Sequence, residues 1–102
     1  MEDKTNKKDK INVKVKFFAD FYEITKFRER EIELTDGADI FQLLEILFKL
    51  FDIRRKIFDD KNEFRKYIHI LKNGRKIQYL NGGKTKLKNG DVIAFFPPVS
   101  GG

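Results

Sequence analysis

The segment from residue 40 to residue 51 constrains the fold more than any other part of the chain. Its apolar residues recur at positions 40, 43, 44, 47, 48 and 51, which is the spacing of one face of a helix. Asp39 comes directly before this segment, and Gln42 follows three residues later, so the pair predicts a capping box at the helix start. Further apolar residues widen the face until only Gln42, Glu45 and Lys49 are polar.

A helix this apolar must be covered on more than one side. We expect a sheet to cover one side, and Ile57, Phe58 and Phe64 from the following segment to cover another. A groove on a partner protein is the alternative cover. Residues 52–66 are charged, and the polar run Asp-Asp-Lys-Asn at 59–62 interrupts them, so we interpret this segment as a short irregular or helical excursion.

Four further segments carry strand patterns. Residues 11–18 alternate apolar and polar, residues 28–34 give a second strand, and an aromatic turn at 21–23 links the two. Residues 67–72 form a third strand, closed by an Asn-Gly turn, with a short strand near Ile77 after it. Residues 92–96 are apolar on both faces, as in a central strand, and end at Pro97 and Pro98.

These patterns predict an α+β fold in which a mixed sheet of four to five strands has one main helix packed across it. The 102 residues suit a single domain, because domains usually hold roughly 100–200 residues. We expect residues 1–10 to be a disordered N-terminal tail, residues 11–96 the folded domain, and residues 97–102 an extended C-terminal tail.

The composition excludes most chemistry by the chain's own side chains. There is no Cys and only one His, His69, which excludes disulfides, thiolate nucleophiles and His-rich metal sites. No apolar run approaches the 18 or so residues of a membrane span, and the polar first ten residues are unlike a secretory signal. We therefore expect a cytoplasmic protein with no bound cofactor and no metal.

The net charge of +6 is unevenly distributed. Between Glu63 and Asp91 the chain has eight basic residues and no acidic one: Arg65, Lys66, Lys72, Arg75, Lys76, Lys84, Lys86 and Lys88. This stretch fits a solvated face, a docking face for an acidic protein, or a nucleic-acid footprint. The sequence lacks the aromatic-and-glycine motif of RNA-binding sheets, so a nucleic-acid partner is the weakest of the three.

The C-terminal octet is the most unusual feature. The octet begins with two phenylalanines and ends with two glycines: Phe95, Phe96, Pro97, Pro98, Val99, Ser100, Gly101 and Gly102. Two prolines favour an extended tail, and six extended residues reach at most about 20 Å, far enough to enter a partner's active site. Glycine lacks Cβ, so a narrow channel can approach its backbone closely. The reactive group would be the Gly102 carboxylate, a poor electrophile until it becomes an acyl-adenylate.

This octet, with the Val-x-Phe-Phe-Ala run from Val15, the capped helix and Leu87-x-x-Gly-Asp, resembles the MoaD family over residues 11–102. These proteins are small subunits of molybdopterin synthase with a ubiquitin-like β-grasp fold. The resemblance implies that an E1-like enzyme of the MoeB class uses ATP to adenylate Gly102, and that a persulfide converts the adenylate to a thiocarboxylate. A MoaE-like large subunit would then accept the tail, and the sulfur would form the dithiolene of molybdopterin.

The resemblance also assigns a docking surface beside the tail. Phe18 interrupts the polar face of the first strand, and Phe96 points outward if Phe95 points inward. Phe18 and Phe96 match family docking positions, and Ile77 is a further candidate. Three other functions stay open. One is a ubiquitin-like modifier joined to lysines through Gly102, and another is a basic nucleic-acid-binding module. The third is sulfur delivery to thiamine or to transfer-RNA thiolation, against which the Phe-Phe-Pro-Pro-Val stretch argues.

Overall fold

The computed structural model describes residues 9–97, so the predictions for residues 1–8 and for Pro98 to Gly102 lie outside the described residues. Its elements, in chain order, are β1 (Lys10–Phe17), α2 (Asp20–Thr25), β2 (Glu29–Thr35), α3 (Ile40–Leu50), α4 (Arg54–Ile57), β3 (His69–Lys72), β4 (Arg75–Lys76), the 3-10 helices η1 (Ile77–Tyr79) and η2 (Gly82–Lys84), and β5 (Val92–Phe96).

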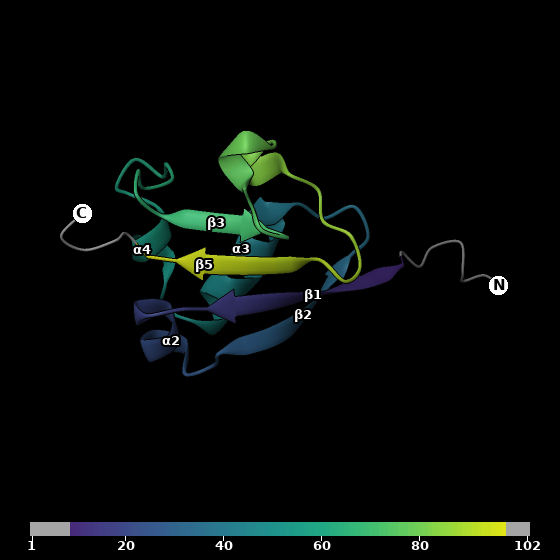
Figure 1. The fold of residues 1–102 in the computed structure, drawn as a ribbon, viewed down its shortest axis with the longest axis horizontal. Helices are drawn as coiled ribbons and strands as arrows, with labels where there is room; N and C mark the ends of the chain where they lie inside the picture. Colours follow the sequence, from purple (N-terminus) through teal and green to yellow (C-terminus); the bar gives the residue numbers. More distant parts are fainter. Residues whose placement is uncertain (1–8, 98–102) are drawn as a thin grey trace.

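The strands form one mixed sheet in the order β2-β1-β5-β3-β4 (Figure 1). The central strands β1 and β5 run parallel, and the other neighbouring pairs are antiparallel. β5 therefore lies in the middle of the sheet, as its two apolar faces predict. The sequence-based prediction of a mixed sheet with one main helix is confirmed.

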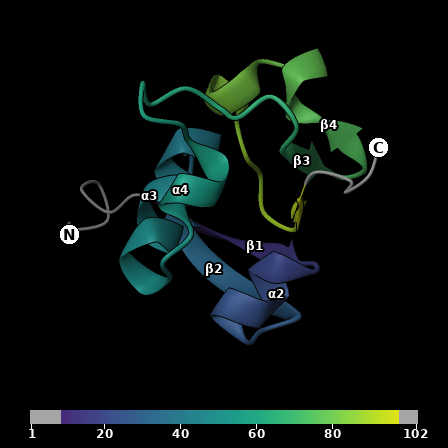
Figure 2. The ribbon, with the colours of Figure 1, turned by 90° about the vertical axis from the view of Figure 1, so that its left-hand side faces the viewer.

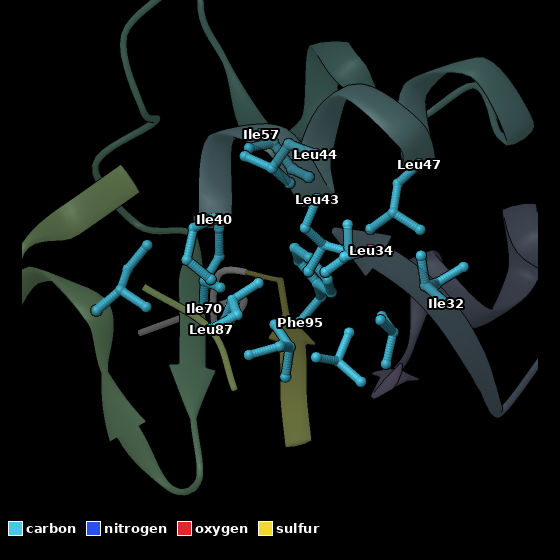
Figure 3. Close-up of a cluster of buried hydrophobic side chains, with 14 of the residues drawn as sticks. Ile32, Leu34, Ile40, Leu43, Leu44, Leu47, Ile57, Ile70, Leu87 and Phe95 are labelled. Atoms are coloured by element: carbon cyan, nitrogen blue, oxygen red, sulfur yellow. The ribbon is translucent and has the colours of Figure 1, made fainter. Parts of the chain in front are cut away.

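The main helix, α3, packs across one face of this sheet (Figure 2). The predicted capping box is present: the backbone N–H of Gln42 donates to Asp39 Oδ1, and that of Asp39 donates to Gln42 Oε1, both at 3.0 Å. Leu43 and Leu47 of α3 point toward the sheet, where Leu34 and Phe95 lie (Figure 3). One hydrophobic core thus fills the space between helix and sheet.

The segment after α3 supplies the predicted second cover. Ile57 is fully buried, and Phe58 and Phe64 form an isolated bridge that closes the loop between them. The ring of Phe41 on α3 stacks on Phe64 with centroids 5.8 Å apart, and Phe48 meets Phe58 edge to face at 5.8 Å. The prediction that Ile57, Phe58 and Phe64 cover α3 is confirmed.

Three local predictions differ from the structure. The expected turn at 21–23 is instead helix α2, because a helical turn brings Phe21 and Thr25, four residues apart, into the core together. The third strand begins at His69 rather than at residue 67, since Ile68 donates to the carbonyl of Arg65, and Arg65 to that of Ile57, which ties this stretch to α4.

The short strand expected near Ile77 is the third difference. The strand, β4, covers only Arg75–Lys76, and Ile77 begins η1. The Asn-Gly turn between β3 and β4 is present as predicted, with Asn73 and Gly74 both at positive φ.

Candidate functional site

The end of β5 is the point where the described chain leads into the Gly-Gly tail. Successive residues of a strand face opposite sides of a sheet, so Phe95 and Phe96 are directed to different faces. Phe95 is fully buried against Phe17 and Phe21, with centroid distances of 5.9 and 5.8 Å. Pro97 follows immediately and is half-buried. The tail is therefore joined directly to the central strand of the sheet.

Phe96 forms an aromatic pair with Phe18 on the outer face of the sheet. The parallel register of β1 and β5 places Phe17 opposite Phe95, which brings the next residues of both strands side by side. The rings of Phe18 and Phe96 stack with centroids 4.4 Å apart and planes 6° apart. Phe18 is 38% exposed, so this apolar pair is open to solvent beside the tail.

A strained turn holds Phe18 in this position. Ala19 has φ +53° and ψ −124°, a backbone conformation that residues with a Cβ rarely adopt. The backbone N–H of Phe21 donates to the carbonyl of Phe18 at 3.0 Å, which closes the turn. The chain thus reverses at once, so Phe21 enters the core while Phe18 stays outside.

Ile77, the third candidate for this surface, does not belong to it. It is only 4% exposed and is part of the hydrophobic core. As the first residue of η1 it lies after β4 has ended, so its side chain no longer follows the alternation of the strand. The exposure predicted for Ile77 is wrong, and the structure brings together only Phe18 and Phe96.

Polar, basic and apolar residues of the neighbouring strands lie around this pair on the outer face of the sheet. His69 lies opposite Phe96 and Leu71 opposite Ala94 in the antiparallel pairing of β3 with β5. Lys16 lies opposite Ala94 on the other side, in the parallel pairing. Within residues 9–97, the buried Nδ1 atom of His69 has no hydrogen-bond partner. The sequence offers no signal for that environment.

A second group of charged residues lies around Pro97, on the helix side of the sheet. Asp20 at the start of α2 pairs with Lys56 of α4, with Nζ and Oδ2 2.8 Å apart. The hydrogen bond from Lys56 holds the pKa of the Asp20 carboxyl below its usual value. Arg55 and Arg65 lie next to this pair and line the same hollow as Pro97. Sequence patterns did not place these arginines near the tail, because their proximity depends on the path of residues 54–68.

The described residues hold no candidate metal centre. Between residues 9 and 97 there is no group of three or more His, Cys, Asp or Glu residues that could hold a metal ion. In the same range, no helix is long and apolar enough to cross a membrane. The predicted reactive residue, Gly102, and the tail residues Pro98, Val99, Ser100 and Gly101 lie outside the described residues.

Comparison with known families finds a model described as the ThiS family, which matches residues 15–102, including the Gly-Gly end. The chain belongs to the ThiS family. Among curated relatives of this ThiS-family chain, small archaeal modifier protein 3 of Haloferax volcanii is 31% identical over 93 residues, covering 90% of this chain and all of the relative.

Solved structures agree with this assignment. Small archaeal modifier protein 1 from Haloferax volcanii has a TM-score of 0.79 at 28% identity, covering 89% of this chain and 99% of its own. A putative molybdopterin converting factor subunit 1 from Pyrococcus furiosus has a TM-score of 0.70 at 34% identity, covering 87% and 99%. The ThiS-family chain has a ubiquitin-like β-grasp fold, as predicted. These similarities do not single out the molybdopterin branch suggested by the terminal octet.

Proposed function

We propose that this chain is a ubiquitin-like carrier that an E1-like adenylating enzyme activates at Gly102. A carboxylate oxygen of Gly102 attacks the α-phosphorus of ATP, pyrophosphate leaves, and the product is an acyl-adenylate. One observation carries the proposal: the central strand β5 leads directly into the Gly-Gly tail, and the match to the ThiS family extends through that tail to residue 102. The carrier supplies the carboxylate, and the partner supplies the nucleotide site and the acid–base groups.

Conjugation to other proteins is the first fate of the adenylate. The relatives that cover most of this chain, at 31% and 32% identity, are named small archaeal modifier proteins. In this reaction a neutral lysine amine attacks the Gly102 carbonyl carbon, AMP leaves, and loss of a proton gives an isopeptide bond. The carrier then remains attached to its target through the tail.

Sulfur delivery to molybdopterin is the second candidate. The Phe-Phe-Pro-Pro-Val run and the 34% identity to a putative molybdopterin converting factor subunit favour it. Here a persulfide sulfur attacks the carbonyl carbon and displaces AMP, and a thiol then cleaves the resulting disulfide to leave a thiocarboxylate. A MoaE-like large subunit would receive that tail and transfer its sulfur to the pterin precursor.

The exposed Phe18–Phe96 pair is the proposed docking surface for these partners. It lies directly beside the first tail residue, and a pair of exposed stacked rings buries a large apolar area when a partner covers it. Phe18→Ala should raise the KM for adenylation about tenfold or more with little change in kcat. Leu50→Ala is the matched control, since Leu50 is 46% exposed but lies at the end of α3, outside the Phe18–Phe96 pair and outside the hollow that Pro97 lines.

The intact mass of the full chain after incubation with an activating enzyme, ATP and a sulfur donor tests the common step. A gain equal to the exchange of oxygen for sulfur, absent when Gly102 is deleted, identifies the thiocarboxylate. An adenylate that never exchanges sulfur identifies a dedicated modifier. A competent enzyme that forms no adenylate would refute the proposal.

A designed variant makes conjugates easy to detect. No Lys or Arg follows Lys88, so trypsin would leave the whole segment 89–102 on a modified lysine. Ser100→Arg creates a cleavage site directly before the two glycines, and trypsin then leaves only Gly-Gly on the target. Expressed in cells, this variant should yield Gly-Gly-lysine peptides that are absent in the same variant lacking Gly102.

A further inference from the structure

Two adjoining hollows lie on the helix side of the sheet, next to the point where the tail begins. The first has a volume of about 290 Å³ and is lined by Asp20, Phe21, Arg55, Lys56, Arg65, Ile68 and Pro97. The second, of about 230 Å³, has a lining that includes Phe64, Arg65, Lys66, Ile68, Ile70 and Ile77. Because they share Arg65 and Ile68, we treat them as one channel, the 65–68 groove.

The groove has an apolar floor and a basic rim. Its floor is built from buried side chains, among them Phe21, Ile68, Ile70 and Ile77. Its rim is formed by Arg55, Lys56, Arg65 and Lys66, and only Lys56 has a carboxylate of the groove, that of Asp20, as its partner. Within residues 9–97, neither Arg55 nor Arg65 has a carboxylate within ion-pairing distance.

Arg65 is fixed in place while its charge stays available. Its Nε donates to the backbone carbonyl of Arg55 at 2.6 Å, which holds the guanidinium group against α4. A guanidinium group held by one nitrogen still has donors on the other two, and this fork suits a carboxylate. The side chain of Arg65 is exposed, so an incoming carboxylate can reach it without first displacing a carboxylate of residues 9–97.

The position of Pro97 identifies which partner would fill the groove. Pro97 lines the first hollow, so any segment bound there touches the first residue of the tail. The end of β5 lies amid α2, α4, the loop after α4 and β3 when the molecule is viewed from this end (Figure 2). A protein that receives the tail must therefore cover this end of the molecule.

We infer that the 65–68 groove binds an acidic, aliphatic peptide segment of the enzyme that activates Gly102, and this inference rests on the proposed function. Aspartate or glutamate side chains pair with Arg55 and Arg65, and leucine-like side chains occupy the hollow that Ile68 and Ile70 line. The groove lies on the opposite face of the sheet from the Phe18–Phe96 pair. A partner that binds both surfaces therefore contacts the first residue of the tail, Pro97, from both faces of the sheet. Single-stranded RNA fits less well, because bases bind by stacking on free aromatic rings, and the ring of Phe64 in the groove already packs against Phe41 and Phe58.

The direct test titrates the full ¹⁵N-labelled chain with a short peptide of alternating Asp and Leu. We expect saturable shifts at the amides of residues 65–70 and 77–83, and weaker binding as salt is added. Arg55→Glu should weaken binding about tenfold, because a charge-assisted contact is replaced by repulsion. This variant retains the backbone carbonyl that Arg65 uses, and Arg55→Glu with Arg65→Glu should weaken binding further.

The matched control is Lys10→Glu with Arg75→Glu, which makes the same change in net charge as the double groove variant at two exposed residues outside the groove. The inference is overturned if the peptide gives no saturable shifts, if the shifts map to Leu71 and Ala94 on the outer face, or if the control weakens binding equally. It is also overturned if an oligouridylate binds the groove more tightly than the peptide.

The adenylation assay separates this inference from the proposed function. Arg55→Glu should raise the KM for the carrier about tenfold and leave kcat near the wild-type value. Normal adenylation with an unchanged KM overturns the groove assignment and leaves the proposed function standing. Peptide binding without any adenylation of the wild-type chain overturns the assignment of the segment to an activating enzyme.

Discussion

Gly83 and Phe41 offer a sharp test of how the aromatic cover of α3 is built. Gly83 is buried in η2, and a Cβ added there would lie 2.2 to 2.5 Å from three atoms of the Phe41 ring. Carbon atoms normally approach to about 3.5–4.0 Å, so the ring would have to move by more than an ångström. Gly83 is not among the residues with positive φ, so alanine fits its backbone and the whole conflict is with the ring.

The expected cost follows from two opposing effects. Overpacking of this kind costs about 1–3 kcal/mol, because the displaced ring loses its stack on Phe64. Replacing glycine with alanine also stabilises the folded chain by about 0.4–1 kcal/mol, since it restricts the unfolded state. Gly83→Ala should therefore lower the free energy of unfolding by about 1–2 kcal/mol. In a Phe41→Ala background the clash is gone, and the same substitution should raise it by about 0.4–1 kcal/mol.

Urea unfolding of the wild-type chain, the two single variants and the double variant, followed by far-UV circular dichroism, measures all four free energies. The decisive result is that Gly83→Ala lowers the free energy of unfolding in the wild-type background and raises it in the Phe41→Ala background. If Gly83→Ala costs the same in both backgrounds, the ring of Phe41 does not lie over Gly83. If Gly83→Ala leaves the free energy of unfolding unchanged in the wild-type background, the Phe41 ring can leave its stack on Phe64 without loss of stability.

Three further substitutions test the turn, the cap and the ion pair. Ala19→Gly should stabilise the fold by about 1 kcal/mol, because relief of the strain at positive φ exceeds the entropy cost of glycine, and the midpoint of thermal unfolding should rise by several degrees. An unchanged or lower midpoint would argue against strain at Ala19. Asp39→Ala should lower the free energy of unfolding by about 0.5–2 kcal/mol, because the backbone N–H of residue 42 loses its side-chain acceptor. Gln42→Ala removes only the other hydrogen bond of the box, so it should lower the free energy of unfolding by less in the same urea measurement. For Asp20, whose pKa is lowered in the folded chain, the ion pair stabilises the fold above about pH 4 and that stability is lost as the pH falls through the folded pKa. Because the pair is exposed, the free energy of unfolding of the wild type should exceed that of Asp20→Asn by less than about 1 kcal/mol at pH 6 and by progressively less as the pH falls below about 4. A gap that widened in acid would contradict this assignment.

Local patterns predicted the elements whose periodicity is decided by neighbouring residues. The spacing of apolar residues from Ile40 and the Asp39–Gln42 box located the start of α3 to the residue and its end to within one residue. The two apolar faces of residues 92–96 correctly indicated a central strand. In both cases the pattern of apolar residues within the element itself matches its buried positions, so the sequence of that element is enough to predict it.

The sequence failed where distant contacts decide the conformation. α2 is too short for a periodic pattern, and it forms because Phe21 packs on Phe95, far away along the chain. Ile77 alternates like a strand residue, yet the chain turns into η1 and buries it. The groove arginines come together because residues 54–68 fold back past α2 and Pro97, and no local spacing reports that path.

The parallel register of β1 and β5 connects the core to the surface beside the tail. Two consecutive phenylalanines lie at the end of each strand, Phe17 and Phe18 at the end of β1 (Phe18 just past it) and Phe95 and Phe96 in β5. The pairing of Phe17 with Phe95 stacks those two rings inside the core at 5.9 Å. The same register stacks Phe18 on Phe96 outside at 4.4 Å. A slip of one residue would exchange buried and exposed faces along the whole strand, which the core does not tolerate. The inner stack therefore fixes the outer one, and the proposed docking pair is positioned at the base of the tail before any partner binds.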